Sequence, residues 1–358
     1  MPDSLPIRRR SAKVRSDMPQ DNPLAATGLL QHVTGFPAAM RTAWTEAQRF
    51  ACELPADSRA IVVSGMGGSA SAGDLTAALA ALSGHAVPVV PVASYRLPGW
   101  VGQQHLVIAV SYSGDTEETL AVFEQAATAG AQLAAVTAGG ELWRRALANH
   151  VPAFRIAYEA PPRHSLAWTL PPLLAAAHRC GAFPGLPAEI EAAVTFLEAE
   201  VRSPEFLGLA HRIAQTCAGR VTVFYGGEHL APVARRWKNQ CNENAKHLAF
   251  ADELPGGNHN SIMGLDFPGT PLAIVMLESE RFASGLLARA QASREVMAGP
   301  SLVFREVPVR GPSLLVETLW ASLLGDAVSL WLSLLNGVEA LPIGRITALK
   351  ERLAARHP

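Results

Sequence analysis

The 358-residue chain is about twice the size of a typical domain, so its length predicts two domains. Apolar residues make up 49% of it and charged residues 17%, a composition that supplies large buried cores and excludes an intrinsically disordered chain. The formal net charge of −1 creates no global field for nucleic acid or an anionic membrane, so local groups must hold any charged ligand.

No segment of the sequence indicates export or membrane insertion. Residues 1–25 are polar, basic and proline-punctuated without an apolar core, which predicts a loose tail and not a secretory signal. A nucleic-acid-binding arm is the alternative for these basic residues, although nothing else in the sequence supports a nucleic-acid partner. No run of about eighteen apolar residues is present, so we expect no membrane span.

The cysteines indicate a reducing compartment. Their spacing contains no C-x-x-C and no other close pair, which argues against a disulfide framework and against a zinc site. We therefore expect free, buried thiols and a cytoplasmic location. The cysteines are Cys52, Cys180, Cys217 and Cys241.

In the first half of the chain, short β-rich apolar runs alternate with alanine- and leucine-rich helical runs. Strands are predicted at 60–65, 86–92, 105–111 and 132–137. The intervening runs, such as "SAGDLTAALAALSG", are long enough to form helices that cross over between parallel strands. This order predicts an α/β domain with a parallel sheet flanked by helices.

The second half of the chain repeats this order. Strands are predicted at 220–227, 271–277 and 301–309, a long helix at 230–246, and two final helices separated by a loop rich in glycine and proline. Both halves open with a strand, a glycine pair and a helix, at "VVSGMGGSASAGD" and "TVFYGGEHLAPVA". We therefore expect two similar α/β domains.

The boundary between these domains is predicted at 181–206. Glycines and prolines flank a helical segment there, as is typical of a connection between domains. The expected organisation is a tail at 1–25, a first domain at 26–185 and a second domain at 200–358.

The glycine-rich turn "SGMGGSASAGD" (64–74) follows the first predicted strand. It begins like the dinucleotide fingerprint G-x-G-x-x-A, but that fingerprint needs an acidic residue about 20 positions later, and 85–94 contains none. There is no G-K-[S/T], which excludes a nucleotide P-loop. Dinucleotide binding is therefore the least favoured interpretation, beside two others: a structural tight turn, or an anion-binding turn in which backbone N–H groups and the hydroxyls of Ser69 and Ser71 donate.

The turn "SYSGDTEETL" (111–120) concentrates hydroxyl groups at the end of another predicted strand. The carboxyl ends of parallel strands share one crevice, so this turn and the glycine-rich turn should be neighbours. Capping of the following helix by Ser113, Asp115 or Thr116 is the alternative, but a cap needs only one hydroxyl. Ser111, Ser113 and Thr116 together supply three hydroxyls, more than a cap requires, so the pattern favours a phosphate cradle without a lysine.

Polar side chains also concentrate at 238–264, in a chain otherwise rich in alanine and leucine. Glu243 and His259 are residue types suited to proton transfer near neutral pH. The alternative interpretations are a solvated helix residue for Glu243 and an ordinary loop histidine for His259. The other polar members are Asn239, Asn242, Asn244, Lys246, Asn258 and Asn260.

Four segments in this order, "GMGGSASAGD", "SYSGDTEETL", "NENAKHLAF" and "NHN", resemble the bifunctional phosphoglucose/phosphomannose isomerases of the sugar isomerase (SIS) superfamily. D-x-x-S-x-x-L at 326–332 and I-x-x-L-K at 346–350 resemble the tail of that family. The resemblance implies an α/β fold of two SIS-type domains in a homodimer, without cofactor or metal. It also implies reversible isomerisation of glucose 6-phosphate or mannose 6-phosphate with fructose 6-phosphate.

The resemblance assigns a phosphate cradle to both turns. Gly68 and Ser69 would contribute from the first turn, and Ser111, Ser113 and Thr116 from the second. Backbone amides and neutral hydroxyls would hold the phosphate of the sugar.

The resemblance also assigns four catalytic residues. Glu243 matches the base that moves a proton between C2 and C1 through a cis-enediol, and Arg163 resembles the arginine that stabilises the enediolate. His259 matches a ring-opening residue donated by the partner subunit, and Lys350 resembles a lysine that assists ring opening.

The chain departs from the family pattern at several positions. Asp115 stands where asparagine is usual, Ser261 replaces an acidic residue, and "PGG" at 255–257 replaces a different segment. We expect the Asp115 carboxylate to point away from a bound phosphate, as a helix cap. The departures bear on substrate preference and rate, and a non-catalytic regulator that binds sugar phosphates is the alternative function. An aminosugar synthase is disfavoured, because about 40 residues before the first strand cannot hold an amidotransferase domain.

Overall fold

The computed structural model describes residues 22–50, 52, 57–84, 86–266, 269–297 and 302–355. Most of the predicted tail, at 1–21, lies outside the described residues. The remainder of that segment enters the 3-10 helix η1 (Pro23–Thr27), whose Leu24 is fully buried. The packed body of the described structure therefore begins at η1.

The first sheet contains five parallel strands in the order β2-β1-β3-β4-β5. Every residue of β1 and of β3 is buried, as expected for central parallel strands covered on both faces. The four predicted strands are confirmed to within three residues, and the short edge strand β5 is an addition. The strands are β1 (Ala60–Gly65), β2 (Val89–Val92), β3 (His105–Ser111), β4 (Gln132–Thr137) and β5 (Ala153–Arg155).

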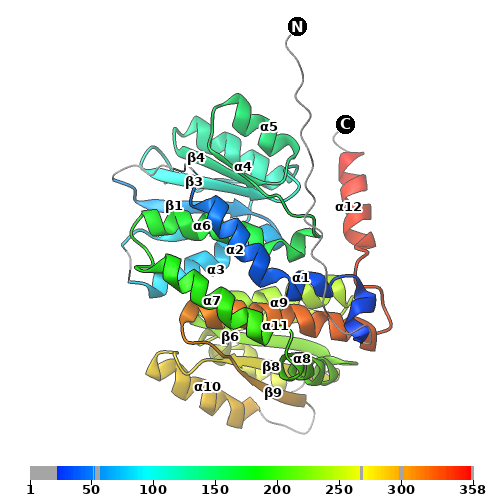
Figure 1. Ribbon diagram of the computed structural model, residues 1–358. Helices are drawn as coiled ribbons and strands as arrows, with labels where there is room; N and C mark the ends of the chain where they lie inside the picture. The colour runs from blue at the N-terminus through cyan, green and yellow to red at the C-terminus, as the bar shows by residue number, and fades with distance from the viewer. Residues whose placement is uncertain are drawn as a thin grey trace.

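Helices cover both faces of this sheet (Figure 1). Successive residues of a strand point to opposite faces, so Ile61 and Ile108 pack with α2, α3 and α6, whereas Val62 and Val107 pack with α4. Helix α5 lies beside α4 on that second face. The bounds are α2 (Phe36–Ala47), α3 (Gly68–Leu82), α4 (Glu117–Thr128), α5 (Gly140–Ala148) and α6 (Leu166–Arg179).

The second sheet contains four parallel strands in the order β7-β6-β8-β9, and therefore repeats the beginning of the first. The three predicted strands and the long predicted helix, α9, are confirmed, and β7 is an addition. The strands are β6 (Val221–Gly227), β7 (Ala249–Leu254), β8 (Leu272–Glu278) and β9 (Leu302–Pro308). The helices around them are α8 (Pro204–Cys217), α9 (Ala231–Asn244), α10 (Ser284–Met297) and α11 (Leu314–Leu335).

One hydrophobic core connects the two halves. Figure 1 shows α9 and α11 between the two sheets, and α7 (Leu186–Glu200), which occupies the predicted boundary segment, contacts both α2 and α11. Helix α11 is long and apolar enough to cross a membrane by length and composition, but 83% of its most apolar window is buried inside the protein. Its apolar composition is therefore that of a core helix, since α8, α9 and α7 pack around it.

The C-terminal helices, the cysteines and the short elements complete the described structure. The two predicted final helices, α11 and α12, are confirmed, and α12 carries the exposed side chains of Ile346 and Leu349. The cysteines are free thiols, three of them buried and one half-buried. The remaining bounds are α1 (Leu30–Thr34), η2 (Pro162–His164), η3 (Glu228–Leu230), η4 (Gly256–His259), η5 (Ser261–Leu265) and α12 (Gly344–Ala354).

Candidate active site

The glycine-rich turn after β1 brings the start of α3 against η2. A Cβ added at Gly68 would lie 2.6 Å from the carbonyl oxygen of Pro162 and 3.0 Å from Cα of Arg163. Both contacts are to backbone, so only glycine permits this approach. Gly67, the residue before the helix, has a φ of +53°, a conformation that glycine adopts readily. The turn therefore sets the position of Arg163.

The second turn follows β3, which pairs with β1 so that Gly65 lies opposite Val110. Its hydroxyls hold its own backbone and one another: Ser111 Oγ lies 2.9 Å from Thr116 Oγ1 and accepts a hydrogen bond of 3.0 Å from the N–H of Gly114. Ser113 Oγ accepts one of 3.2 Å from the N–H of the next residue. The predicted neighbourhood of the two turns is confirmed by the register of their strands.

Helix capping does not explain these hydroxyls. Thr116 is the N-cap residue of α4, yet its side chain makes no capping hydrogen bond. Asp115 does act as a cap, but of a different helix: its Oδ1 accepts a 2.8 Å hydrogen bond from the N–H of Glu141, in the first turn of α5. The capping alternative for α4 is therefore wrong, and Asp115 caps α5 instead.

The predicted base and the predicted arginine lie side by side. Glu243 is in the last turn of α9, and its Oε2 is 3.7 Å from Nη1 of Arg163 in η2. Arg163 is buried, while the Glu243 side chain keeps 24% of its surface exposed. Burial raises the pKa of the Glu243 carboxyl, and the positive charge of Arg163 opposes that increase. The result is an accessible carboxylate whose affinity for protons exceeds that of an ordinary glutamate.

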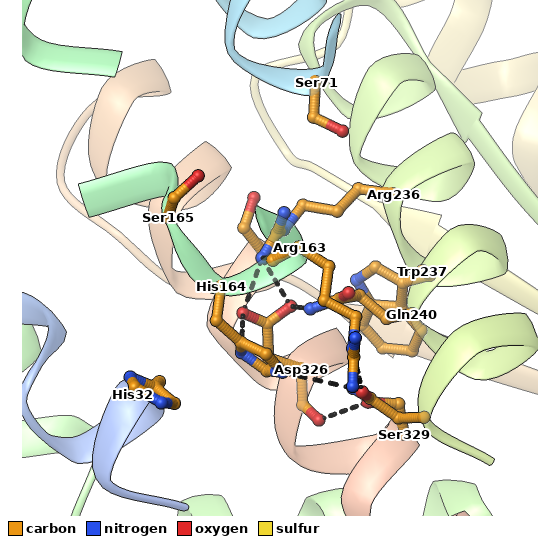
Figure 2. A network of polar contacts seen from close by, with 12 residues as sticks. His32, Ser71, Arg163, His164, Ser165, Arg236, Trp237, Gln240, Asp326 and Ser329 are labelled. Atoms are coloured by element: carbon orange, nitrogen blue, oxygen red, sulfur yellow. Dashed lines mark hydrogen bonds and ion pairs between the residues drawn. The ribbon is translucent and has the colours of Figure 1, made fainter. Parts of the chain in front are cut away.

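A buried polar network supports this pair from the second half of the chain (Figure 2). Arg236 Nη2 donates to both carboxylate oxygens of Asp326, at 2.8 and 2.6 Å, and to the carbonyl oxygen of Arg163 at 3.1 Å. Gln240 Nε2 also donates to Asp326, at 2.6 Å. The network links η2, α9 and α11, and therefore fixes the two halves of the chain relative to each other.

Sequence reasoning assigned no role to these supporting residues. Arg236, Gln240 and Asn244 are spaced four residues apart on α9, and all three are buried. Residues at this spacing share one face of a helix, so three polar side chains in this register indicate a buried polar face. That spacing is the signal by which the network could have been found.

In the described part of the chain, the other two predicted catalytic residues are not in contact with the Glu243–Arg163 pair. His259, in η4, is exposed and lines a groove of about 540 Å³ together with Glu253 and Arg289. Lys350 is exposed on α12. Among the described residues, neither makes a hydrogen bond or ion pair with Glu243. Within that same part of the chain, no group of three or more His, Cys, Asp or Glu side chains is placed to hold a metal ion.

Comparisons with known proteins agree with this architecture. The SIS domain model matches residues 56–162, and the model of the bacterial phospho-glucose isomerase C-terminal SIS domain matches 207–353. The structure of tagatose-6-phosphate ketose/aldose isomerase from Escherichia coli shares the fold, with a TM-score of 0.64 at 19% identity over 89% of this chain and 98% of that one.

Two curated relatives are similar over most of their length. The bifunctional phosphoglucose/phosphomannose isomerase of Caldicellulosiruptor bescii is 30% identical over 337 residues, which are 91% of this chain and 99% of the relative. The protein of the same name from Aquifex aeolicus is 30% identical over 297 residues, 82% of this chain and 90% of the relative. Two SIS domains, a carboxylate paired with an arginine beside two hydroxyl-rich turns, and these similarities lead to one conclusion: the chain is an enzyme of the bifunctional phosphoglucose/phosphomannose isomerase family.

Proposed function

We propose that this isomerase reversibly converts glucose 6-phosphate and mannose 6-phosphate into fructose 6-phosphate through ring opening and a cis-enediol. The observation that carries the proposal is the pairing of Glu243 with Arg163 at 3.7 Å, next to the first turn of α3. A carboxylate whose pKa is raised by burial is a base suited to proton transfer near neutral pH.

In the proposed step, Glu243 removes the proton from C2 of the open-chain aldose, and the C1 carbonyl oxygen, which takes up the negative charge, receives the hydrogen of the C2 hydroxyl. The proton returns to C1 while the oxygen on C2 becomes the carbonyl. Negative charge grows on these two oxygens, and Arg163 Nη1 is a fixed countercharge that needs no reorganisation. One carboxylate that reaches both faces of the enediol would accept both C2 epimers. The chemistry is internal proton transfer, so we expect it to proceed with no cofactor or metal.

The phosphate of the sugar would occupy the crevice between the two turns. Gly68 and Ser69 would donate from the start of α3, where backbone N–H groups and the helix dipole favour an anion. Ser111, Ser113 and Thr116 would donate from the second turn by rotating their hydroxyls away from their present partners. A phosphate held here keeps the reacting carbons near Glu243, which shortens the path of the proton.

Ring opening would use His259 and Lys350. Both side chains are exposed, so a second subunit can approach them. We propose a homodimer in which His259 completes the site of the partner subunit, and in which Lys350 shares the proton transfers to and from the ring oxygen. Neither role requires a nucleic acid or a membrane.

Glu243→Gln tests the proposal, because it keeps the size of the side chain and removes its basicity. We expect conversion of each hexose 6-phosphate, followed in a coupled assay, to fall by about 100- to 10,000-fold. Thermal stabilisation by the sugar phosphates should persist, since the phosphate cradle is intact. The control is Glu205→Gln, an exposed glutamate in the first turn of α8, which should keep full activity.

Two results would overturn the proposal. Full activity of Glu243→Gln would show that another group moves the proton. Stabilisation of the unaltered protein by sugar phosphates, without turnover of any hexose 6-phosphate, would support the regulator alternative in place of catalysis.

A further inference from the structure

The guanidinium of Arg163 has a nearly complete set of protein partners. Its Nε donates to Asn244 Oδ1 at 2.5 Å, and its Nη2 donates to the carbonyl oxygens of Ala340 and Leu341 at 3.0 and 3.1 Å. A guanidinium carries five N–H groups, and these bonds account for three of them. The two hydrogens that remain are on Nη1, the nitrogen that lies 3.7 Å from Glu243. The protein therefore presents a single, defined nitrogen toward the base.

This arrangement depends on the orientation of the Asn244 amide. An amide can turn over and exchange its oxygen and nitrogen, which would place an N–H group against the Nε–H of Arg163. The shorter of the two contacts of Asn244 Nδ2 selects one orientation: Ser329 Oγ accepts its hydrogen bond at 2.9 Å, whereas His164 Nε2 lies 3.4 Å away. The Ser329 hydroxyl donates its own hydrogen to the carbonyl oxygen of Asp326, at 2.6 Å.

The two bonds of Ser329 have one consequence. A hydroxyl has one hydrogen, and that of Ser329 is used by the backbone of α11, so toward Asn244 it can only accept. Asn244 must therefore present Nδ2 to Ser329 and Oδ1 to Arg163. Both Asn244 and Ser329 are fully buried, so water does not substitute for a lost partner at low cost.

We propose that Ser329 and Asn244 are positioning residues for Arg163: Ser329 fixes the amide of Asn244, and Asn244 fixes the guanidinium that stabilises the enediolate. The proposal rests on the proposed isomerisation, because it gives Arg163 a role in the transition state. Neither residue touches the substrate, so their effect is on the rate of the chemical step more than on binding of the phosphate.

The chain offers a matched control for Ser329. Ser333 is one turn further along α11, is equally buried, and donates to the carbonyl oxygen of Leu330 at 2.7 Å. Both hydroxyls therefore make the same bond to the residue three positions earlier in the same helix. Only Ser329 has a link to Asn244, so the difference between Ser329→Ala and Ser333→Ala isolates that link.

We expect Ser329→Ala to lower kcat by about 10- to 100-fold with a change in KM of less than about threefold, because a small displacement of a group that acts in the transition state has effects of this size. Ser333→Ala should retain the kcat of the unaltered enzyme. Thermal unfolding of both variants shows whether they are folded and equally stable. Equal kcat values for the two variants would overturn the proposal.

A double-mutant cycle with Arg163→Ala separates positioning from a general structural effect. If Ser329 acts through Arg163, then Ser329→Ala adds little further loss of kcat once Arg163 is absent. Losses of kcat that multiply in the double variant would overturn the proposal.

A second measurement is thermal stabilisation by a five-carbon sugar-acid phosphate, whose carboxylate mimics the enediolate. This stabilisation should be weaker in Ser329→Ala than in the unaltered protein, and unchanged in Ser333→Ala. Equal stabilisation of the two variants would overturn the proposal, and this measurement does not require turnover of any hexose 6-phosphate.

Discussion

Replacement of Gly68 by alanine should impair catalysis far more than folding. The added Cβ would be 2.6 Å from the carbonyl oxygen of Pro162, whereas ordinary contact begins at 3.4 Å. The backbone of η2 must then retreat by roughly 0.8 Å, and Arg163 moves with it. A misplacement of about 1 Å in a catalytic group reduces the rate by about 100-fold, so we expect kcat/KM to fall by about 10- to 100-fold.

The stability change in Gly68→Ala should be small by comparison. Overpacking costs about 1–3 kcal/mol, and the better helix propensity of alanine offsets up to about 1 kcal/mol of that. Urea unfolding measures this change, and a coupled isomerase assay measures kcat/KM. The control is Gly73→Ala on the same helix, where the new Cβ meets Cγ1 of Val63 at 2.9 Å, a side chain beneath α3. An equal loss of activity in both variants would refute the role of Gly68 in placing Arg163.

Two further predictions concern carboxylates whose pKa is shifted from its ordinary value. The acid limb of the pH profile of kcat/KM should lie above the ordinary glutamate pKa of about 4.3, because burial raises the pKa of Glu243; a limb at or below that value would contradict Glu243 as the base. Glu317→Ala should lower the free energy of unfolding by about 3–5 kcal/mol in urea titrations, because it leaves buried donors without an acceptor. Burial would raise the pKa of Glu317, but hydrogen bonds from His229 and Ser279 outweigh it and lower that pKa. This carboxylate therefore stabilises the native state at pH values above its unfolded pKa, and that stabilisation disappears as the pH falls through its folded pKa. If Glu317→Ala lowered the free energy of unfolding by less than about 1 kcal/mol, the stabilising role of Glu317 would be contradicted.

The sequence was informative where chemistry is local. Strand, turn and helix follow one another within ten residues at 111–120, so the number and spacing of hydroxyls could be compared with what a cap requires. Asp115 shows the limit of that reasoning. Its carboxylate does cap a helix, but the helix is α5, about 25 residues further along, because β3 and β4 are neighbours in the sheet. A sequence pattern does not contain that neighbourhood.

The spacing on α9 indicates a buried polar face, but the partners of that face could not be predicted because they come from distant segments. Arg163 contacts Asn244, 81 residues away in the sequence, and the carbonyl oxygen of Leu341, 178 residues away.

Strand β7 was also missed by the sequence analysis. Its sequence, "AFADEL", lies inside the polar segment that contains the candidate catalytic residues, and two acidic residues conceal its alternation. Pairing with β6 stabilises this strand in spite of its composition.

The duplicated architecture also bears on why we propose the phosphate cradle for the first domain and not for the second. Strands β6 and β8 occupy the places of β1 and β3, so the turns after them should form a second crevice. Glu317 fills that place from the start of α11: its Oε2 accepts hydrogen bonds from Ser279 Oγ at 2.6 Å and from His229 Nε2 at 2.9 Å. Donors that could bind an external anion are thus used by a carboxylate of the chain itself. In the proposed mechanism, the donors of the first domain bind the substrate, while the second domain supplies Glu243 as the base together with the network around Arg163.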